Sequence, residues 1–222
     1  MDWEGGRVLS RILKKIRWAD NNLFASLMKV LYYNIVKKNR FAIFELDLTQ
    51  KFESPSLDPQ HYNVRVMDYK ELASLIAGKE NLPREFYMHE IDGVRYCVII
   101  TSGDRIGHIS WIYLKGDQDR WFDLLNEEAH VNYSFTFSEY RGMAFFPQAL
   151  LAAAEWLKAR KYQRILMDVH METIFMLNSM KKINGVRRIG TLTQWFVYRP
   201  KFRRKNSPIL GEPRLNGNRS LQ

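Results

Sequence analysis

The segment from residue 130 to residue 147 places a strand, a tight turn and the start of a helix in an order that suits anion binding. The strand reads His-Val-Asn-Tyr-Ser-Phe-Thr-Phe, and Gly142 lies in the turn before an apolar helix that Pro147 opens. In such an arrangement successive backbone N–H groups point into one concavity, and the positive end of the helix dipole adds to the attraction. We therefore expect residues 142–146 to hold a phosphate or pyrophosphate without a basic patch.

Strict alternation along the strand would divide its side chains between two faces. One face would carry His130, Asn132, Ser134 and Thr136, and the other Val131, Tyr133, Phe135 and Phe137. A histidine near its ordinary pKa of about 6.5 can deprotonate an ammonium through a water molecule. His130 is therefore a candidate general base. Asn132 and Ser134 lie beside it and are candidates for contacting the substrate that carries the ammonium group. The alternative is that His130 is simply solvated or hydrogen-bonded.

Several other kinds of site have no support in the sequence. The five histidines show no i,i+4 pairing and no cysteine partner, so we expect no zinc or other transition-metal site. No P-loop, no dinucleotide-binding glycine motif and no serine-hydrolase elbow occurs either. The usual signals of phosphoryl transfer, nicotinamide chemistry and serine hydrolysis are thus missing.

The elements that would position the site alternate between strands and helices, which is typical of a layered α/β or α+β fold. Strands are expected at 64–67, 95–101, 106–114, 130–137, 164–169 and 193–198, and helices at 68–77, 84–89, 147–160 and 173–183. Before them, two amphipathic helices are expected at 8–16 and 23–35, and a strand at 41–48. The turn-rich stretch at 54–59 marks the expected domain boundary.

The net charge of +10 belongs to the two ends of the chain. Residues 1–40 carry nine basic and three acidic side chains, residues 199–222 carry seven and one, and residues 41–198 keep 18 and 20. Nucleic acid is therefore not the expected partner, whereas the basic helix at 7–17 either packs with a solvated face or lies on a membrane surface. The single cysteine and the absence of a secretory segment favour a cytoplasmic protein, either free or peripheral to the inner membrane surface.

Residues 141–146, Arg-Gly-Met-Ala-Phe-Phe, resemble the pyrophosphate-binding motif of the GCN5-related N-acetyltransferase (GNAT) superfamily. In the motif (Gln/Arg)-x-x-Gly-x-(Gly/Ala), the first position matches, Ala144 replaces the glycine and Phe146 replaces the last residue. The Phe146-Pro147 pair is similar to a branch of the superfamily that has an aromatic residue followed by proline. Residues 182–190 resemble a second GNAT pattern, and the order of elements from 62 to 200 follows the GNAT plan.

The resemblance implies an α+β domain at 61–200 with a twisted, mainly antiparallel sheet flanked by helices. A basic helical extension with one strand would occupy 1–60, and a flexible basic tail 201–222. The implied donor is acetyl-CoA or another acyl-CoA, with no metal, and the implied acceptor is the amine of a small molecule, sugar or peptide; a homodimer is compatible with it. The residues implied to bind CoA are Phe135, Phe137, Arg141, Gly142, Met143, Ala144, Phe145, Phe146 and Thr173.

The sequence departs from the superfamily in its candidates for acid and base. Many members carry a tyrosine in the last helix that protonates the leaving thiolate, and the helix at 173–183 has none. Either Tyr133 or water supplies that proton, or the domain binds acyl-CoA without efficient turnover. His130 holds the position where some amine-acetylating members carry a carboxylate base. Three functions remain open: an N-acyltransferase, a non-catalytic acyl-CoA-binding or regulatory domain, and a membrane-surface protein that uses its basic ends.

Overall fold

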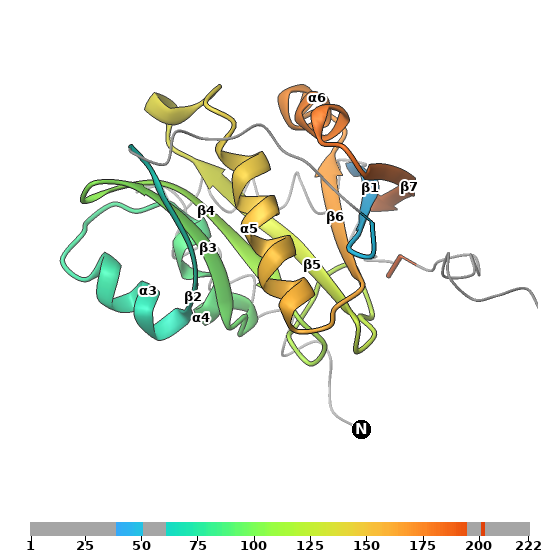
Figure 1. Cartoon of the computed structure of the whole chain (residues 1–222), viewed down its shortest axis with the longest axis horizontal. Helices are drawn as coiled ribbons and strands as arrows, with labels where there is room; N and C mark the ends of the chain where they lie inside the picture. Colours follow the sequence, from blue (N-terminus) through green and yellow to red (C-terminus); the bar gives the residue numbers. More distant parts are fainter. Residues whose placement is uncertain (1–38, 51–60, 195–200, 203–222) are drawn as a thin grey trace, which may run out of the picture.

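Seven strands form one mixed sheet in the order β2-β3-β4-β5-β6-β1-β7. The computed structural model describes residues 39–50, 61–194 and 201–202 (Figure 1). Every neighbouring pair of strands is antiparallel except β5 and β6, which run parallel. The expected α+β fold with a mainly antiparallel sheet is confirmed.

The strands and helices follow the expected order along the chain. The strands are β1 (Asn39–Asp47), β2 (Asn63–Asp68), β3 (Tyr96–Ser102), β4 (Arg105–Tyr113), β5 (Glu128–Thr136), β6 (Arg164–His170) and β7 (Val186–Gln194). The helices are α3 (Tyr69–Ile76), α4 (Met88–Asp92), α5 (Phe145–Ala159) and α6 (Ile174–Lys182), with short 3₁₀ turns η2 (Arg84–Tyr87) and η3 (Ser138–Tyr140).

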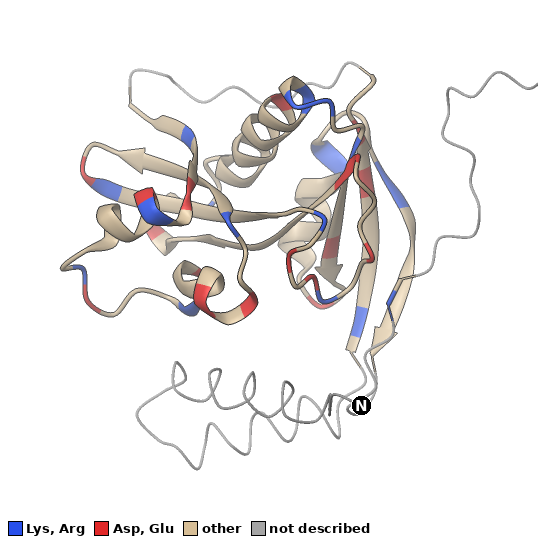
Figure 2. Cartoon of the chain, turned by 90° about the horizontal axis from the view of Figure 1, so that it is seen from below, with Lys and Arg blue, Asp and Glu red and all other residues tan. Residues whose placement is uncertain are grey.

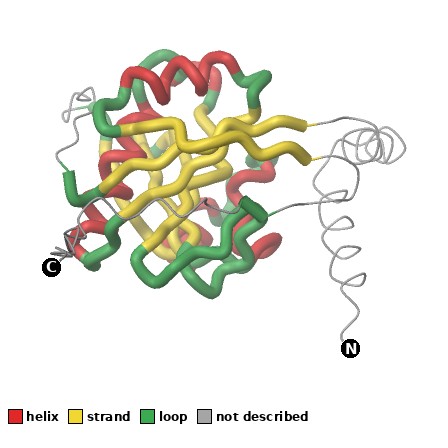
Figure 3. Tube along the Cα trace, turned by 90° about the vertical axis from the view of Figure 1, so that its right-hand side faces the viewer, coloured by secondary structure: helices red, strands yellow, loops and turns green. Residues whose placement is uncertain are grey.

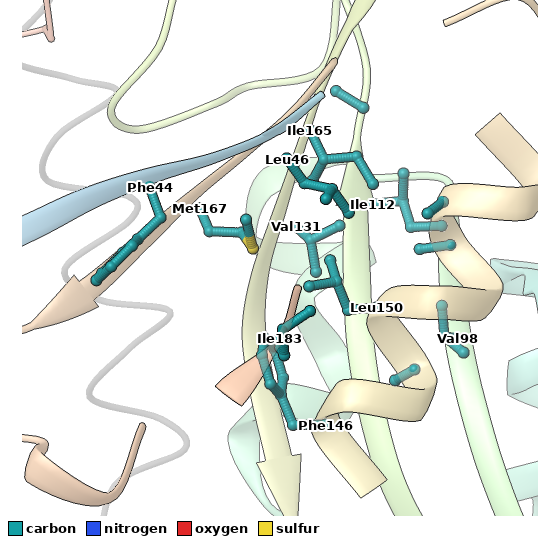
Figure 4. Packing of buried hydrophobic residues seen from close by; sticks show 14 of the residues in the cluster. Phe44, Leu46, Val98, Ile112, Val131, Phe146, Leu150, Ile165, Met167 and Ile183 are labelled. Carbon is teal, nitrogen blue, oxygen red and sulfur yellow. The ribbon is translucent and has the colours of Figure 1, made fainter. Parts of the chain in front are cut away.

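Two hydrophobic clusters lie on opposite faces of the sheet. The first packs α5 and the end of α6 onto one face, and Figure 4 shows Phe146 and Leu150 of α5 directed at Val131 of β5. The second covers the other face with α3, α4 and the loop around Trp121. Figure 3 shows the strands crossing the centre of the molecule with helical segments around them. We call these two sides the α5 face and the α4 face.

Local sequence signals account for the starts of some helices. The Asp68 carboxylate accepts the backbone N–H groups of Lys70 and Glu71, while the Glu71 carboxylate accepts the N–H of Asp68. This reciprocal capping box satisfies backbone donors that the first turn of a helix leaves open. The start of α5 has no such side-chain cap, because its N-cap residue is Ala144, in the left-handed conformation.

The strand expected at 41–48 does not stand outside the main sheet. It forms β1, which pairs with β6 on one side and β7 on the other. Ala42, Ile43 and Leu46 are all buried, so the strand is apolar on both faces, as an interior strand must be. The domain limits at 60 and 200 remain predictions, but the strand assigned to the first segment lies inside the sheet of the second.

β7 begins earlier in the chain than expected. It covers Val186–Gln194, which includes residues 193–194 of the strand expected at 193–198, and residues 195–198 lie outside the described residues. Its Arg187 and Arg188 are exposed, and β7 forms an edge of the sheet. Charged side chains on an edge strand hide the apolar alternation that signals a strand. The segment that resembles the second GNAT pattern therefore runs into a strand.

The described part of the chain carries acidic and basic residues side by side. Figure 2 shows both kinds spread over the sheet and its helices. The helices expected at 8–16 and 23–35, the linker at 54–59 and most of the tail lie outside the described residues. Membrane contact through residues 7–17 is thus still a prediction. Within the described segments, no helix combines the length and apolar character needed to cross a bilayer.

Candidate active site

The two parallel strands at the centre of the sheet separate soon after they start. β5 and β6 pair at Glu128 with Arg164, Ala129 with Ile165 and His130 with Leu166, and at no later position. Both strands continue for several residues beyond this point. Within the described residues, the edge of β5 that faces β6 therefore has no strand partner from Val131 onward.

A β-bulge in β5 begins where the pairing with β6 stops. On the side of β4, Trp111 pairs with Asn132 and Ile109 pairs with Phe135, so Tyr133 and Ser134 together stand opposite Ser110. Tyr133 has φ of 49°, which is rare for a residue other than glycine, and its N–H donates to the Asn132 side-chain oxygen at 2.6 Å. A bulge bends its strand and re-aims the side chains that follow.

The bulge overturns the expected division of side chains in β5. Phe135 and Phe137 pack on the α4 face together with Tyr133, and the Phe137 ring lies 5.9 Å from that of Phe86. Ser134 and Thr136 turn to the α5 face, where they bond to side chains of β4. Strict alternation was wrong after Asn132, because the extra residue shifts the two-residue period by one.

A pocket of about 160 Å³ opens between the separated strands. Its walls are residues 131–134 of β5, residues 167–170 of β6, Phe146 of α5, and Thr173, Met176 and Met180 at and within α6. Five residues expected at the site line this pocket: Asn132, Tyr133, Ser134, Phe146 and Thr173. Asp168 and His170, which also line the pocket, were not predicted as site residues, although Asp168 is a charged residue inside the apolar run of β6.

The turn before α5 presents backbone donors near this pocket. Gly142 has φ of 87° and Ala144 has φ of 58°, and both conformations favour glycine. Within the described segments, no protein acceptor is recorded for the N–H groups of Gly142, Ala144, Phe145 and Phe146. A helix start without a side-chain cap leaves such groups available to an anion.

The other residues expected to bind CoA have different surroundings. Met143 is 43% exposed beside the turn, and Arg141 Nε donates to the Thr136 carbonyl at 3.4 Å. Phe145 is buried and packs against Tyr140, so its side chain belongs to the core and only its backbone is available. Phe135 and Phe137 do not line the pocket.

His130 is buried between two carboxylates. Its Nδ1 lies 2.5 Å from Asp119 Oδ2, and its Nε2 lies 2.9 Å from Asp168 Oδ1. Asp119 is itself fixed, because its other oxygen accepts the backbone N–H groups of Trp121 and Phe122. The ring is 1% exposed and does not line the pocket. These contacts favour the hydrogen-bonded alternative for His130 over the role of general base.

The three side chains carry a net negative charge. Burial by itself lowers the pKa of His130, but the charges and hydrogen bonds of Asp119 and Asp168 outweigh it and raise the pKa to about 9. Burial also raises the pKa of Asp119, yet the His130 charge holds that pKa below its ordinary value. At neutral pH one imidazolium therefore stands between two carboxylates. Only the Asp168 end reaches the pocket.

Tyr133 faces a mixed set of charges on the α4 face. Its ring lies 6.1 Å from the Tyr113 ring, and the Arg84 guanidinium lies 5.9 Å from its centroid. Burial is the main reason that the pKa of the Tyr133 phenol is raised, with a further contribution from the charge of Asp92. The phenol thus keeps its proton at neutral pH.

A second buried histidine lies on the α5 face among hydroxyl groups. His108 Nδ1 lies 2.7 Å from Thr136 Oγ1, and its Nε2 lies 2.7 Å from Ser110 Oγ. Ser110 Oγ lies a further 2.7 Å from Ser134 Oγ, at the pocket wall. We call these four residues the hydroxyl chain. Burial lowers the pKa of His108 to about 3, so the ring is neutral at ordinary pH.

No cluster of metal ligands accompanies these groups. Among the described residues, His, Cys, Asp and Glu form no group of three or more that could hold a metal ion. Asp119 and Asp168 bond to different ring nitrogens of His130, so the three side chains do not converge on a point. What the site offers is a polar pocket wall, a carboxylate and a row of backbone donors.

No protein-family model matches the chain, and no curated protein matches it. Among solved structures, it is similar to a protein described as an acetyltransferase of the GNAT family from Novosphingobium aromaticivorans (13% identity, TM-score 0.47, 72% of this chain and 64% of that chain). A GCN5-related N-acetyltransferase from Sphaerobacter thermophilus gives 12% identity and a TM-score of 0.46, covering 76% and 55%. An acetyltransferase from the GNAT family from Colwellia psychrerythraea gives 7% and 0.47, covering 86% and 72%.

The chain spans less than two thirds of the length of the first two of these proteins. The superfamily that residues 141–146 resemble is the one that these descriptions name.

Proposed function

We propose that the chain transfers an acyl group from acyl-CoA, such as acetyl-CoA, to an amine. The observation that carries the proposal is the separation of β5 and β6 directly after His130, with a pocket opening at that point. An extended ligand can pair with the free edge of β5 as an added strand would. The pantetheine arm of CoA, which contains two amide groups, has the chemistry for such pairing.

The pyrophosphate of CoA would bind at the start of α5. The N–H groups of Gly142, Ala144, Phe145 and Phe146 have no acceptor in the described part of the chain, and they lie in one turn and the first helical residues. Such donors, together with the helix dipole, bind phosphate groups without a basic side chain. Phe146 also lines the pocket, so the same residue links the pyrophosphate end to the acyl end.

The amine would meet Asp168. This carboxylate lines the pocket, and its Oδ1 is held by His130. For Oδ2, no hydrogen bond is recorded within the described segments. A net negative charge attracts an ammonium group, and a carboxylate can accept the proton that the amine must lose before it attacks the thioester. Asp168 therefore takes the role that the sequence suggested for His130.

A non-catalytic acyl-CoA-binding domain is the second candidate, and one observation favours it. No tyrosine is present in α6, whose inner positions at the pocket are Met176 and Met180. The two candidates share the binding of CoA and differ in turnover. Release of free thiol from acetyl-CoA in the presence of glucosamine, spermidine or lysine separates them.

Binding is tested by calorimetric titration of CoA into the full chain and two glycine variants. Gly142→Val should weaken CoA binding by about tenfold or more, because β-branched residues resist a φ of 87° and a misplaced turn loses one or two hydrogen bonds to the pyrophosphate. Gly78→Val is the matched control, since Gly78 has φ of 74° and, like Gly142, has open space around its Cβ position. Equal CoA affinity in a folded Gly142→Val variant would refute the proposed site.

A further inference from the structure

The hydroxyl chain runs through buried groups from solvent to the part of the pocket wall formed by Ser134. Ser110 and His108 are inaccessible to solvent, whereas Ser134 and Thr136 at the two ends are partly exposed. The three contacts within the chain are each 2.7 Å long. Thr136, His108, Ser110 and Ser134 thus form one continuous row that ends at the pocket wall.

The tautomer of His108 limits the direction of the hydroxyl chain. A neutral imidazole carries one N–H, so it donates through one ring nitrogen and accepts through the other, and each hydroxyl has a single hydrogen to give. If Nε2 of His108 donates, the Ser110 hydrogen is available to Ser134 Oγ, and in that arrangement the Ser134 hydrogen is left for a ligand. If Nδ1 donates, Nε2 accepts the Ser110 hydrogen, so Ser134 must donate its own hydrogen to Ser110. Its oxygen can then only accept a hydrogen bond from a ligand.

We infer that the hydroxyl chain aims the Ser134 O–H at the sulfur of the acyl donor and stabilises the thiolate that leaves. This inference rests on the proposed function, because it assigns a role within acyl transfer. The amine nitrogen bonds to the acyl carbon and gives its proton to Asp168. As the thioester C–S bond then breaks, its electron pair moves to sulfur, and the Ser134 hydrogen bond offsets that charge while Ser134 keeps its proton. The developing charge favours the direction in which Nε2 of His108 donates.

Two features of the site support this role. Ser134 lines the same pocket as Met176 and Met180 of α6, the helix that lacks a tyrosine. Hydrogen bonds in a row polarise one another, so a donor at the end of a chain is stronger than an isolated hydroxyl. The low pKa of His108 keeps the ring neutral, which is what makes the row directional.

Comparing two kinds of acyl donor separates a catalytic role of Ser134 from a structural one, because loss of structure would lower activity with both donors equally. Ser134→Ala should lower kcat with acetyl-CoA by ~10²-fold, and little or not at all with p-nitrophenyl thioacetate, whose thiol is more acidic and leaves without help. Thr136→Val should lower kcat with acetyl-CoA by a smaller factor of roughly 3- to 10-fold, and Thr136→Ser should restore it. Ser138→Ala is the control, because Ser138 lies four residues beyond Ser134 and is not part of the hydroxyl chain.

The ¹⁵N shifts of His108 in the CoA-bound protein give a reading that needs no turnover. The hydrogen is expected on Nε2, and a hydrogen on Nδ1 would overturn the inference. So would a Ser134→Ala variant that loses activity equally with both donors. If the unaltered protein does not bind CoA, the proposed function fails and the inference falls with it. If it binds and turns over CoA but Ser134→Ala is fully active, only the inference fails.

Discussion

His108 and His130 stand on neighbouring strands, are both buried, and use both ring nitrogens in short contacts. Burial alone lowers the pKa of each, because a charged ring loses its hydration. Only the partners differ. Two carboxylates raise the pKa of His130 to about 9, whereas two hydroxyls leave that of His108 at about 3.

The comparison shows how one bulged strand can separate two kinds of chemistry. The α4 face receives a charged group that ends in Asp168, and the α5 face receives a neutral row that ends in Ser134. Both ends reach the same pocket. The charged side suits a cationic acceptor, and the neutral side suits a thioester and its leaving group. The bulge at Tyr133 makes this possible, because it turns Ser134 away from the face of His130.

The largest expected effect is the loss of unfolding free energy when the imidazole ring of His130 or of His108 is removed. His130→Gln is expected to cost ~3–5 kcal/mol of unfolding free energy, because it leaves two buried carboxylates without their cation. His108→Gln should cost less, ~1–3 kcal/mol, because it breaks only neutral hydrogen bonds. Urea unfolding at pH 7 measures both values. Equal losses would mean that the two rings have the same charge.

A smaller effect should appear in how stability depends on pH. The folded-state pKa of His130 lies above the ordinary 6.5, so its contribution is complete below pH 6.5 and is lost as the pH rises through about 9. The folded-state pKa of His108 lies below 6.5, so the buried ring lowers the stability of the fold as the pH falls from 6.5 toward 3. Each ring should change stability by ~1.4 kcal/mol per pH unit within its own window.

The two glutamine variants separate these windows. His130→Gln should flatten the loss of stability between pH 7 and 9. His108→Gln should flatten the loss between pH 6.5 and 4.5, a range chosen above the ordinary pKa of aspartate. Thermal unfolding across these ranges provides the measurement. A wild-type curve without a decline above pH 7 would contradict the charged state of His130.

Much of the fold could be predicted from the sequence because its elements are local. Asp68 and Glu71 cap α3 within four residues, and most of the expected strands and helices are present in the structure. Most of β7 was not predicted, because exposed arginines on this edge strand interrupt the alternation of apolar and polar residues. β1 was recognised as a strand, but its place between β6 and β7 depends on pairing with residues far along the chain.

The site was harder to predict because its chemistry depends on contacts between distant residues. Gly142 and Ser134 were found from a local pattern of strand, turn and helix. The bulge was missed, since nothing in the composition of β5 announces an extra residue opposite Ser110. The bond from His130 to Asp119 joins β5 to a loop, and the bond to Asp168 joins it to β6. Neither contact can be read from spacing.

Hydrogen–deuterium exchange with and without CoA tests most directly whether the unpaired edge of β5 receives the acyl donor. We expect CoA to slow exchange in residues 131–137 and 141–146. β2 serves as the internal control, because it is an edge of the same sheet on the far side from the pocket and its exchange should not change. Unchanged exchange in residues 131–137 at saturating CoA, or protection of β2 instead, would contradict the account.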